Sequence, residues 1–526
     1  MEFPEVSGEK VNDKTHLPGM KGGFCGLFRY LKERPFFSAC LFFILLKIVY
    51  LLVGYHRGLS VQGYEDLARL YHSYTFKGFQ FLPDGVPWLP LHQIIQMFFT
   101  LPRSHTLFLC SFFQTIVSIT AGITAALFAR EVLGKSWRAG VATLAAWAGS
   151  YAVTIIGIGY LSEPLFHLEM FAVLYFGLRW MKNGGGKWRN WTILSVVAMQ
   201  LTRYEGWVLT FLYMLILLLI LIDSRRRALW PHYKGLWEFS TKDFFKLIVF
   251  ISIVPLLWMG VNWILRGDPF FFANVMQKNF KSHVSMYYLK KIEFYLEYLY
   301  GAWEAQPLVI VLGLAIILLP GLLHTPAFLL LVTICTLTVF NLHCIMREKT
   351  AYPYQQRLSI TLFVSFCPLF GAVIAHCHRR LIEKFSLKNL ANILFALIVL
   401  VMLIMGVNGF RGRTPVLYNE MAMEIIDILN AELRKDPDAS KPRVLLEVTD
   451  WDYSIILFYI DMDESNYVNF GKNDIDTPHE ILRAHPSIRY IVLNHNQENL
   501  DWAKNCKACH LLSTSSMWDL YVYDKP

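Results

Sequence analysis

The feature that most constrains this chain is a series of apolar runs, each about 20 residues long and almost without charge. A helix of that length matches the hydrocarbon core of a bilayer. Of the 526 residues, 55% are hydrophobic and 17% are charged, whereas a soluble domain carries about 25% charged residues. We therefore expect an α-helical polytopic membrane protein. The net charge of +9 is then better interpreted through its distribution among the loops, and we expect no nucleic-acid partner.

Eleven runs are predicted to span the membrane: 36–55, 105–129, 138–157, 164–181, 190–206, 207–223, 246–265, 307–323, 326–342, 358–375 and 390–409. With the N-terminus inside, the inner segments contain 23 Lys and Arg residues, and the longer outer loops contain 12. Because cytoplasmic loops are enriched in Lys and Arg, this bias predicts a cytoplasmic N-terminus and an extracytoplasmic, periplasmic C-terminus in a cell inner (plasma) membrane. The polar first 20 residues favour a retained anchor over a cleaved signal peptide.

One apolar segment, "PWLPLHQIIQMFF" at 87–99, is short and contains two prolines and a histidine, His92. Counting it as a full span would invert every later loop and place the basic loops outside. We therefore expect a helix that lies along the outer surface or dips into it.

The chain divides into three predicted parts. Residues 1–35 form a cytoplasmic segment, and 36–410 form the membrane domain, whose first outer loop covers 56–104. In 411–526, the β-rich runs "RVLLEV", "YIVLN" and "LYVYD" alternate with the polar helical stretches "TPHEILRAHP" and "NQENLDWAKN". This alternation predicts a small extracytoplasmic α/β domain.

The first outer loop contains an unusual stretch of acids and aromatics, "GYEDLARLYHSYTFKGFQF". Wound as a helix, 64–76 has aromatic and aliphatic residues on one side, and Glu65, Asp66 and Arg69 on the other. This pattern predicts an interfacial amphipathic helix whose carboxylates face water or a cavity. An ordinary solvated ion pair between Glu65 and Arg69, four residues apart, also accounts for the charges.

Two further charged segments lie at the outer ends of predicted spans. In "GYLSEPLFHLE", Glu163 opens a span. It either has a function or is a helix N-terminal acid that complements the helix dipole, with Ser162 as the cap. In "LTRYEGW", Arg203 and Glu205 interrupt a long apolar stretch. They either belong to a site or form a structural network, in which they pair with each other or with Glu163.

A third segment, "REKTAYPYQQRLSI", precedes the tenth predicted span and contains Tyr354 and Arg357. Arginine binds phosphate with two parallel hydrogen bonds and stays charged. Arg, Lys and Tyr are also ordinary anchors at a membrane edge, and both interpretations stay open here.

Together these segments resemble the GT-C superfamily of polytopic glycosyltransferases, which includes bacterial family 39, protein O-mannosyltransferases and the aminoarabinose transferase of lipid A. The resemblance rests on Leu67-Ala68, Gly78-Phe79, "PWLPLH", "SEPLF" and "TRYEG". It implies a loop with two helices along the membrane and an Asp or Glu near its start as catalytic base. An alignment from Gly63 and Gly78 places this acid on Gln62, which cannot act as a base. An alignment from Leu67-Ala68 places it at Glu65 or Asp66, and we prefer this one.

The resemblance implies an inverting transfer of a sugar from a polyprenyl-phosphate donor to an extracytoplasmic lipid, glycan or protein. In this interpretation Glu65 or Asp66 is the base, and Arg357 contacts the donor phosphate. The other candidate substrate-binding residues are Arg203, Glu163, Glu205, His92 and Tyr354. Two alternatives remain: a lipid or solute transporter or flippase, and a non-catalytic assembly protein. Transporters usually contain inverted repeats, and no such duplication is evident here.

No set of His, Cys and Asp residues with the spacing of metal ligands is evident on the outer side, although two acids could hold a divalent cation. The motif "CKACH", Cys506 to His510, matches the attachment pattern of a c-type haem. Its surroundings indicate a helix end followed by strands, which disfavours haem. A local disulfide or two free thiols are the alternatives.

Overall fold

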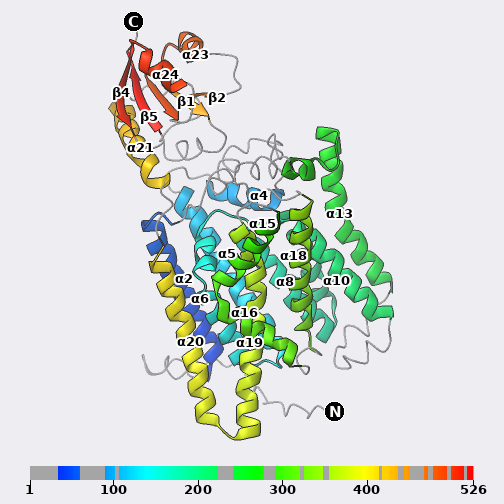
Figure 1. Ribbon diagram of the computed structural model, residues 1–526. Coiled ribbons are helices and arrows are strands. Elements are labelled where there is room, and N and C mark those ends of the chain that lie inside the picture. Colours follow the sequence, from blue (N-terminus) through cyan, green and yellow to red (C-terminus); the bar gives the residue numbers. More distant parts are fainter. Residues whose placement is uncertain are drawn as a thin grey trace, which may run out of the picture.

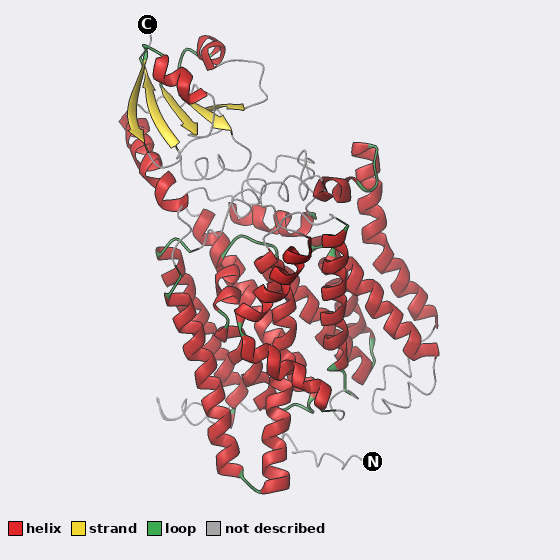
Figure 2. Ribbon diagram, in the orientation of Figure 1, coloured by secondary structure: helices red, strands yellow, loops and turns green. Residues whose placement is uncertain are grey.

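The computed structural model describes residues 33–59, 89–100, 106–222, 241–277, 291–319, 325–347, 355–413, 418–435, 443–448, 467–471, 478–494, 499–514 and 518–524. A bundle of helices forms the main body, and a small sheet with helices lies beyond one end of it (Figures 1 and 2). We call this the upper end of the bundle, and it contains the last residues of α2 (Pro35–His56) and α20 (Lys388–Arg411). Arg57 joins them by donating a 3.3 Å hydrogen bond to the Phe410 carbonyl.

Among the described residues, six helices are long and apolar enough to cross a membrane. They are α2, α5 (Thr106–Val132), α13 (Thr241–Arg266), α18 (Phe328–Met346), α19 (Gln355–Phe385) and α20. Two bent pairs raise this number to eight. They are α6 (Trp137–Gly149) with α7 (Tyr151–Ile158), and α15 (Lys291–Ala305) with α16 (Pro307–Leu314) and the 3₁₀ turn η2 (Ala315–Leu318).

The remaining predicted spans coincide with α8 (Glu163–Asn183), α9 (Gly186–Thr202) and α10 (Glu205–Ile222). The prediction of an α-helical polytopic membrane protein is therefore confirmed, with six to eight apolar spans. The count of eleven stays a prediction.

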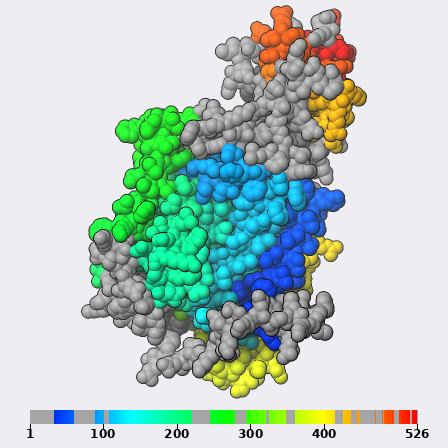
Figure 3. All heavy atoms as spheres, turned by 180° about the vertical axis from the view of Figure 1, so that it is seen from behind, coloured from blue at the N-terminus to red at the C-terminus, as the bar shows by residue number. Residues whose placement is uncertain are grey.

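Helix α19 is the central helix of the bundle. In the apolar stretch of α19, 94% of the residues are buried, compared with 17% in that of α20 and 22% in those of α2 and α13. The space-filling view shows α2 in dark blue and α13 in green at opposite sides of the rear face (Figure 3). Side chains such as Leu397, Leu400 and Ile264 are apolar and exposed, as expected for helices that face lipid.

The bend of 74° between α6 and α7 interrupts the helical hydrogen bonds inside the bundle. Nearby side chains supply replacements, which an irregular backbone at membrane depth requires. The Ser150 hydroxyl accepts a hydrogen bond from the Val153 amide, and Gln306 Nε2 donates to the Gly149 carbonyl at 3.4 Å. The buried ammonium of Lys47 donates to Thr154 Oγ1 at 3.0 Å.

Helix α4 (Pro90–Thr100) has 11 residues, too few to span a bilayer. It lies across the upper end of the bundle and packs on α5 and α9 (Figure 1). This arrangement agrees with the surface helix predicted for 87–99.

The C-terminal part contains a five-stranded mixed sheet with strand order β2-β1-β3-β5-β4. Strands β1 (Val444–Val448), β2 (Tyr467–Gly471) and β3 (Tyr490–Asn494) are parallel, and β5 (Trp518–Tyr523) is antiparallel to β3 and to β4 (Cys509–Thr514). The accompanying helices are α21 (Tyr418–Lys435), α23 (Pro478–Ala484) and α24 (Asn499–Asn505). The sequence predicted β1, β3, β5, α23 and α24, but it did not predict β2 and β4.

Helices α6 and α19 cross so closely that a side chain at Gly371 would overlap Thr143 Oγ1 and the Ala139 carbonyl oxygen. We expect Gly371→Ala to destabilise the protein by about 1–3 kcal/mol because the crossing must open. Gly260→Ala in α13 is the matched control, since nothing lies within 4 Å of the added methyl group. There, alanine should stabilise the helix by up to about 1 kcal/mol. Thermal unfolding in detergent measures both effects, and equal shifts would contradict the close crossing.

Candidate functional site

Three helix ends meet at the upper end of the bundle and form the candidate site. Helix α8 begins at Glu163, α9 ends at Thr202, and α10 begins at Glu205. Arg203 follows α9 in an extended conformation, with φ −149° and ψ 149°. Each charge complements its helix dipole, because the acids lie at helix N-termini and the arginine lies at a C-terminus.

Arg203 binds both acids. Its Nη1 lies 2.6 Å from Glu163 Oε1, and its Nη2 lies 2.7 Å from Glu205 Oε1. Its Nε donates further to Glu205 at 3.3 Å. The exposed fractions of the side chains are 0% for Glu163, 8% for Arg203 and 13% for Glu205, so the three charges are almost fully removed from solvent. We call these residues the acid–arginine triad; with one cation and two carboxylates, it carries a formal charge of −1.

The segment around Arg203 is fixed by its neighbours. Thr202 Oγ1 donates to Glu169 Oε1 at 2.9 Å, which ties the end of α9 to α8. Trp207 Nε1 donates to the Gln200 carbonyl at 2.9 Å across the α9–α10 turn. Tyr204 accepts a hydrogen bond from Trp258 and stacks on the ring of Phe272, with the two ring centroids 4.6 Å apart. The guanidinium therefore has little freedom to turn.

His92 of α4 lies near this region and is completely buried. Its Nε2 is 2.6 Å from Gln114 Nε2, and Gln114 donates to the Leu161 carbonyl at 3.0 Å. Gln96, also on α4, donates to the Tyr160 carbonyl at 3.2 Å. Helix α4 thus fixes the segment that leads into Glu163. The substrate contact expected of His92 stays a prediction.

Arg357 lies in the first turn of α19, and only its place on the backbone is described. One turn further along each helix, His167 of α8 is 3.0 Å from Thr361 Oγ1 of α19. Because Glu163 and Arg357 each precede this contact by four residues, the first turns of the two helices lie at a similar level. Glu65, Asp66 and Tyr354 lie outside the described residues.

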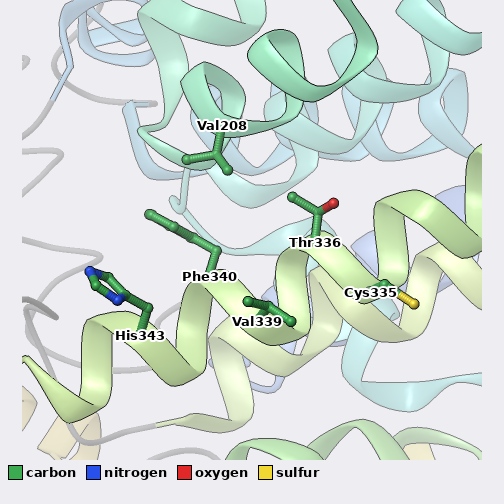
Figure 4. Close-up of a pocket in the computed structure, with 6 residues that line it drawn as sticks. All are labelled: Val208, Cys335, Thr336, Val339, Phe340 and His343. Atoms are coloured by element: carbon green, nitrogen blue, oxygen red, sulfur yellow. The ribbon is translucent and has the colours of Figure 1, made fainter. Parts of the chain in front are cut away.

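An apolar groove lies between α10 and α18, next to the triad. It has a volume of about 450 Å³ and is lined by Val208, Cys335, Thr336, Val339, Phe340 and His343 (Figure 4). Val208 follows Glu205 by one turn of α10, so the groove begins beneath the triad. The exposed fraction of Val339 is 64%, and the groove opens sideways from the bundle. A hydrocarbon chain suits such a surface better than a polar ligand does.

Glu169 lies inside a predicted span and is buried, and it was not among the predicted site residues. Its position at membrane depth was the available signal, because an acid there normally has a partner or a function. In the part of the chain that the structure describes, no three His, Cys, Asp or Glu residues gather to hold a metal ion.

We expect Arg203→Met to destabilise the protein by about 3–5 kcal/mol, because Glu163 would stay buried without its cation. Arg379→Met is the control, since the Arg379–Glu383 pair is more than half exposed and 3.9 Å long, and such pairs contribute less than about 1 kcal/mol. Adding Glu163→Gln to Arg203→Met should restore part of the loss. Thermal unfolding in detergent tests this order, and an Arg203→Met protein as stable as the control would contradict it.

Comparisons with known proteins identify the fold but not a sequence family. No family model matches the chain, and no curated protein matches it. Its structure resembles ArnT from Cupriavidus metallidurans bound to undecaprenyl phosphate, with a TM-score of 0.56 and 11% identity over 92% of this chain and 97% of ArnT. The apo state of ArnT gives a TM-score of 0.58 with the same identity and coverage.

A second similar protein is the Archaeoglobus fulgidus oligosaccharyltransferase, solved tethered to an acceptor peptide. It has a TM-score of 0.50 and 10% identity over 90% of this chain and 71% of that one. Both proteins have the GT-C fold. The chain therefore has the GT-C fold, as its outer segments predicted.

Proposed function

We propose that this protein is an integral-membrane glycosyltransferase that transfers a sugar from a polyprenyl-phosphate donor to an acceptor at the upper end of the bundle. One observation carries the proposal: the buried acid–arginine triad lies one turn of α10 from the start of an apolar groove that opens sideways. A lipid-linked sugar has the same two parts, a hydrocarbon tail and a charged head. A protein with the same fold, ArnT, has been solved with undecaprenyl phosphate bound.

The reaction requires the acceptor hydroxyl to attack the anomeric carbon while the bond from that carbon to the phosphate oxygen breaks. A carboxylate takes the hydroxyl proton, and the polyprenyl phosphate leaves with the bonding electrons. In-line attack with a single carboxylate base inverts the anomeric centre. We propose Glu65 or Asp66 as this base.

Charge places a condition on the donor site. Negative charge grows on the phosphate as it leaves, so cations must lie close to it. The triad alone does not supply them, because both edges of the Arg203 guanidinium are occupied by carboxylates. We therefore propose that Arg357, at the start of the neighbouring α19, binds the phosphate, and that Tyr354 lies beside it. Arg203 and Glu163 would shape the pocket for the sugar.

The Lys and Arg distribution supports an orientation in which the upper end lies on the extracytoplasmic side of the inner membrane. In this orientation the α/β domain faces the acceptor side. A lipid, a glycan or a protein could each be the acceptor.

We expect that replacing the catalytic base, by Glu65→Gln or Asp66→Asn, lowers kcat about 10²–10⁴-fold, since proton transfer loses its acceptor. Glu383→Gln is the control, because Glu383 is an exposed acid near the lower end of α19. The assay measures transfer of radiolabelled sugar from a polyprenyl-phosphate donor to membrane lipids, glycans or proteins. If both acid variants transfer sugar as fast as the control, neither acid is the base.

The groove makes a second prediction. Val339→Trp should fill it and raise the KM for the donor by roughly tenfold, equivalent to about 1.4 kcal/mol of lost contact with the tail, and leave kcat nearly unchanged. Ile264→Trp on α13 is the matched control, since its side chain is 82% exposed and lies outside the groove lining. An unchanged KM in the Val339→Trp protein would exclude this groove as the binding site of the tail.

A further inference from the structure

Cys506 and Cys509 form a close pair at a junction in the C-terminal domain. Helix α24 ends at Asn505, and β4 begins at Cys509. The Cys509 amide donates to the Cys506 carbonyl at 3.0 Å, so the four residues form a hydrogen-bonded turn. Such a turn holds its first and last Cα atoms within about 7 Å, and disulfides need about 4.4–6.8 Å. A hydrogen bond joins the two thiol groups.

The turn is fixed at both sides. The Cys506 amide donates to the Ala503 carbonyl at 3.2 Å, which continues the last turn of α24. On the other side, Cys509 pairs with Tyr523 in the β4–β5 ladder, and the Asp524 amide donates to the Ala508 carbonyl at 2.8 Å. Joining the sulfur atoms would therefore need little movement of the backbone.

The surroundings disfavour a redox-catalytic role for these thiols. Burial, followed by the hydrogen bond with Cys506, raises the pKa of Cys509. Reactive cysteines have the opposite property, a lowered pKa, often at a helix N-terminus. Cys506 instead follows the C-terminal end of α24, where the helix dipole opposes a thiolate. A structural role suits these thiols better.

A metal or haem role also lacks support from the geometry. His510, the last residue of the motif, lies 3.3 Å from Asp524 through its Nε2. In the described part of the domain, these residues do not form a group that could hold a metal ion.

We propose that Cys506 and Cys509 form a disulfide in the mature protein, which joins the end of α24 to the edge of the sheet. A disulfide of an extracytoplasmic thiol oxidant is the co-reactant. One cysteine thiolate attacks it to give a mixed disulfide, and the second displaces the oxidant. The pair loses two electrons and two protons, and the oxidant becomes a dithiol. The proposal is separate from the transferase chemistry, although both place this domain outside the cytoplasm.

Peptide mapping of the full-length protein provides a direct test. Native membranes are treated with N-ethylmaleimide to block free thiols, and the protein is then digested with trypsin without reduction. Trypsin cleaves after Lys504 and Lys507, so the two cysteines fall on different peptides, 505–507 and 508–526. A disulfide is expected to join these peptides into one species that separates after reduction. Two separate peptides that each carry N-ethylmaleimide would overturn the proposal.

The variants Cys506→Ser and Cys509→Ser serve as controls for this map. In each, the remaining cysteine should react with N-ethylmaleimide before reduction, and the linked species should be absent. Sugar transfer should stay within about twofold of the wild-type rate, because neither cysteine belongs to the proposed active site. A linked species in a protein without transferase activity would refute the proposed function alone. Activity with both thiols blocked would refute the disulfide alone.

Discussion

A guanidinium held between two carboxylates, with little access to water, is the interaction on which the upper end of the bundle depends. Glu163 is completely buried, and an acid in that position needs a cation. Arg203 supplies it and binds Glu205 at the same time, so one side chain fixes the ends of α8, α9 and α10. The gain from such a buried pair is largely cancelled by desolvation. We infer that the triad is maintained for the arrangement that it imposes rather than for stability.

The supporting contacts have the same logic. Glu169 holds Thr202 against α8, and Gln114 holds Leu161 against α5. The segments that lead into Arg203 and Glu163 are therefore both fixed by buried polar side chains. Electrostatic catalysis requires groups that are already oriented when charge develops, because reorientation during the reaction costs energy. A rigid triad beside the first turn of α19 would limit where the sugar and phosphate can lie. In the proposed function, the fixed triad would shape the sugar pocket, whereas Arg357 would bind the phosphate.

Much of the fold followed from the sequence because the bilayer imposes a simple rule. Apolar runs of one length are expected to be helices, and every predicted span overlaps a helix or part of a bent pair among the described residues. The bend at Ser150 was not predictable, because Gln306, which donates to the freed Gly149 carbonyl, is distant in sequence. Strand β2 was missed because "YVNFG" contains Asn and Gly, which are rare in strands. Charges at the ends of spans identified Glu163, Arg203 and Glu205 and allowed their pairing, but not its geometry, which depends on how α8 packs against α9. For the same reason Glu169 was overlooked, since Thr202, its partner, is on another helix.

The positions of the groove and of α4 around the triad suggest two separate approaches to the site. The groove between α10 and α18 opens sideways, where its apolar lining would meet lipid tails. Helix α4 and the C-terminal domain lie at the upper end, where a membrane surface would give way to water (Figure 1). A donor that is part of the membrane would arrive by diffusion within the bilayer, whereas a polar acceptor would arrive from above. Because the two substrates differ so strongly in polarity, a site at the boundary between lipid and water lets each approach without leaving the solvent that it prefers.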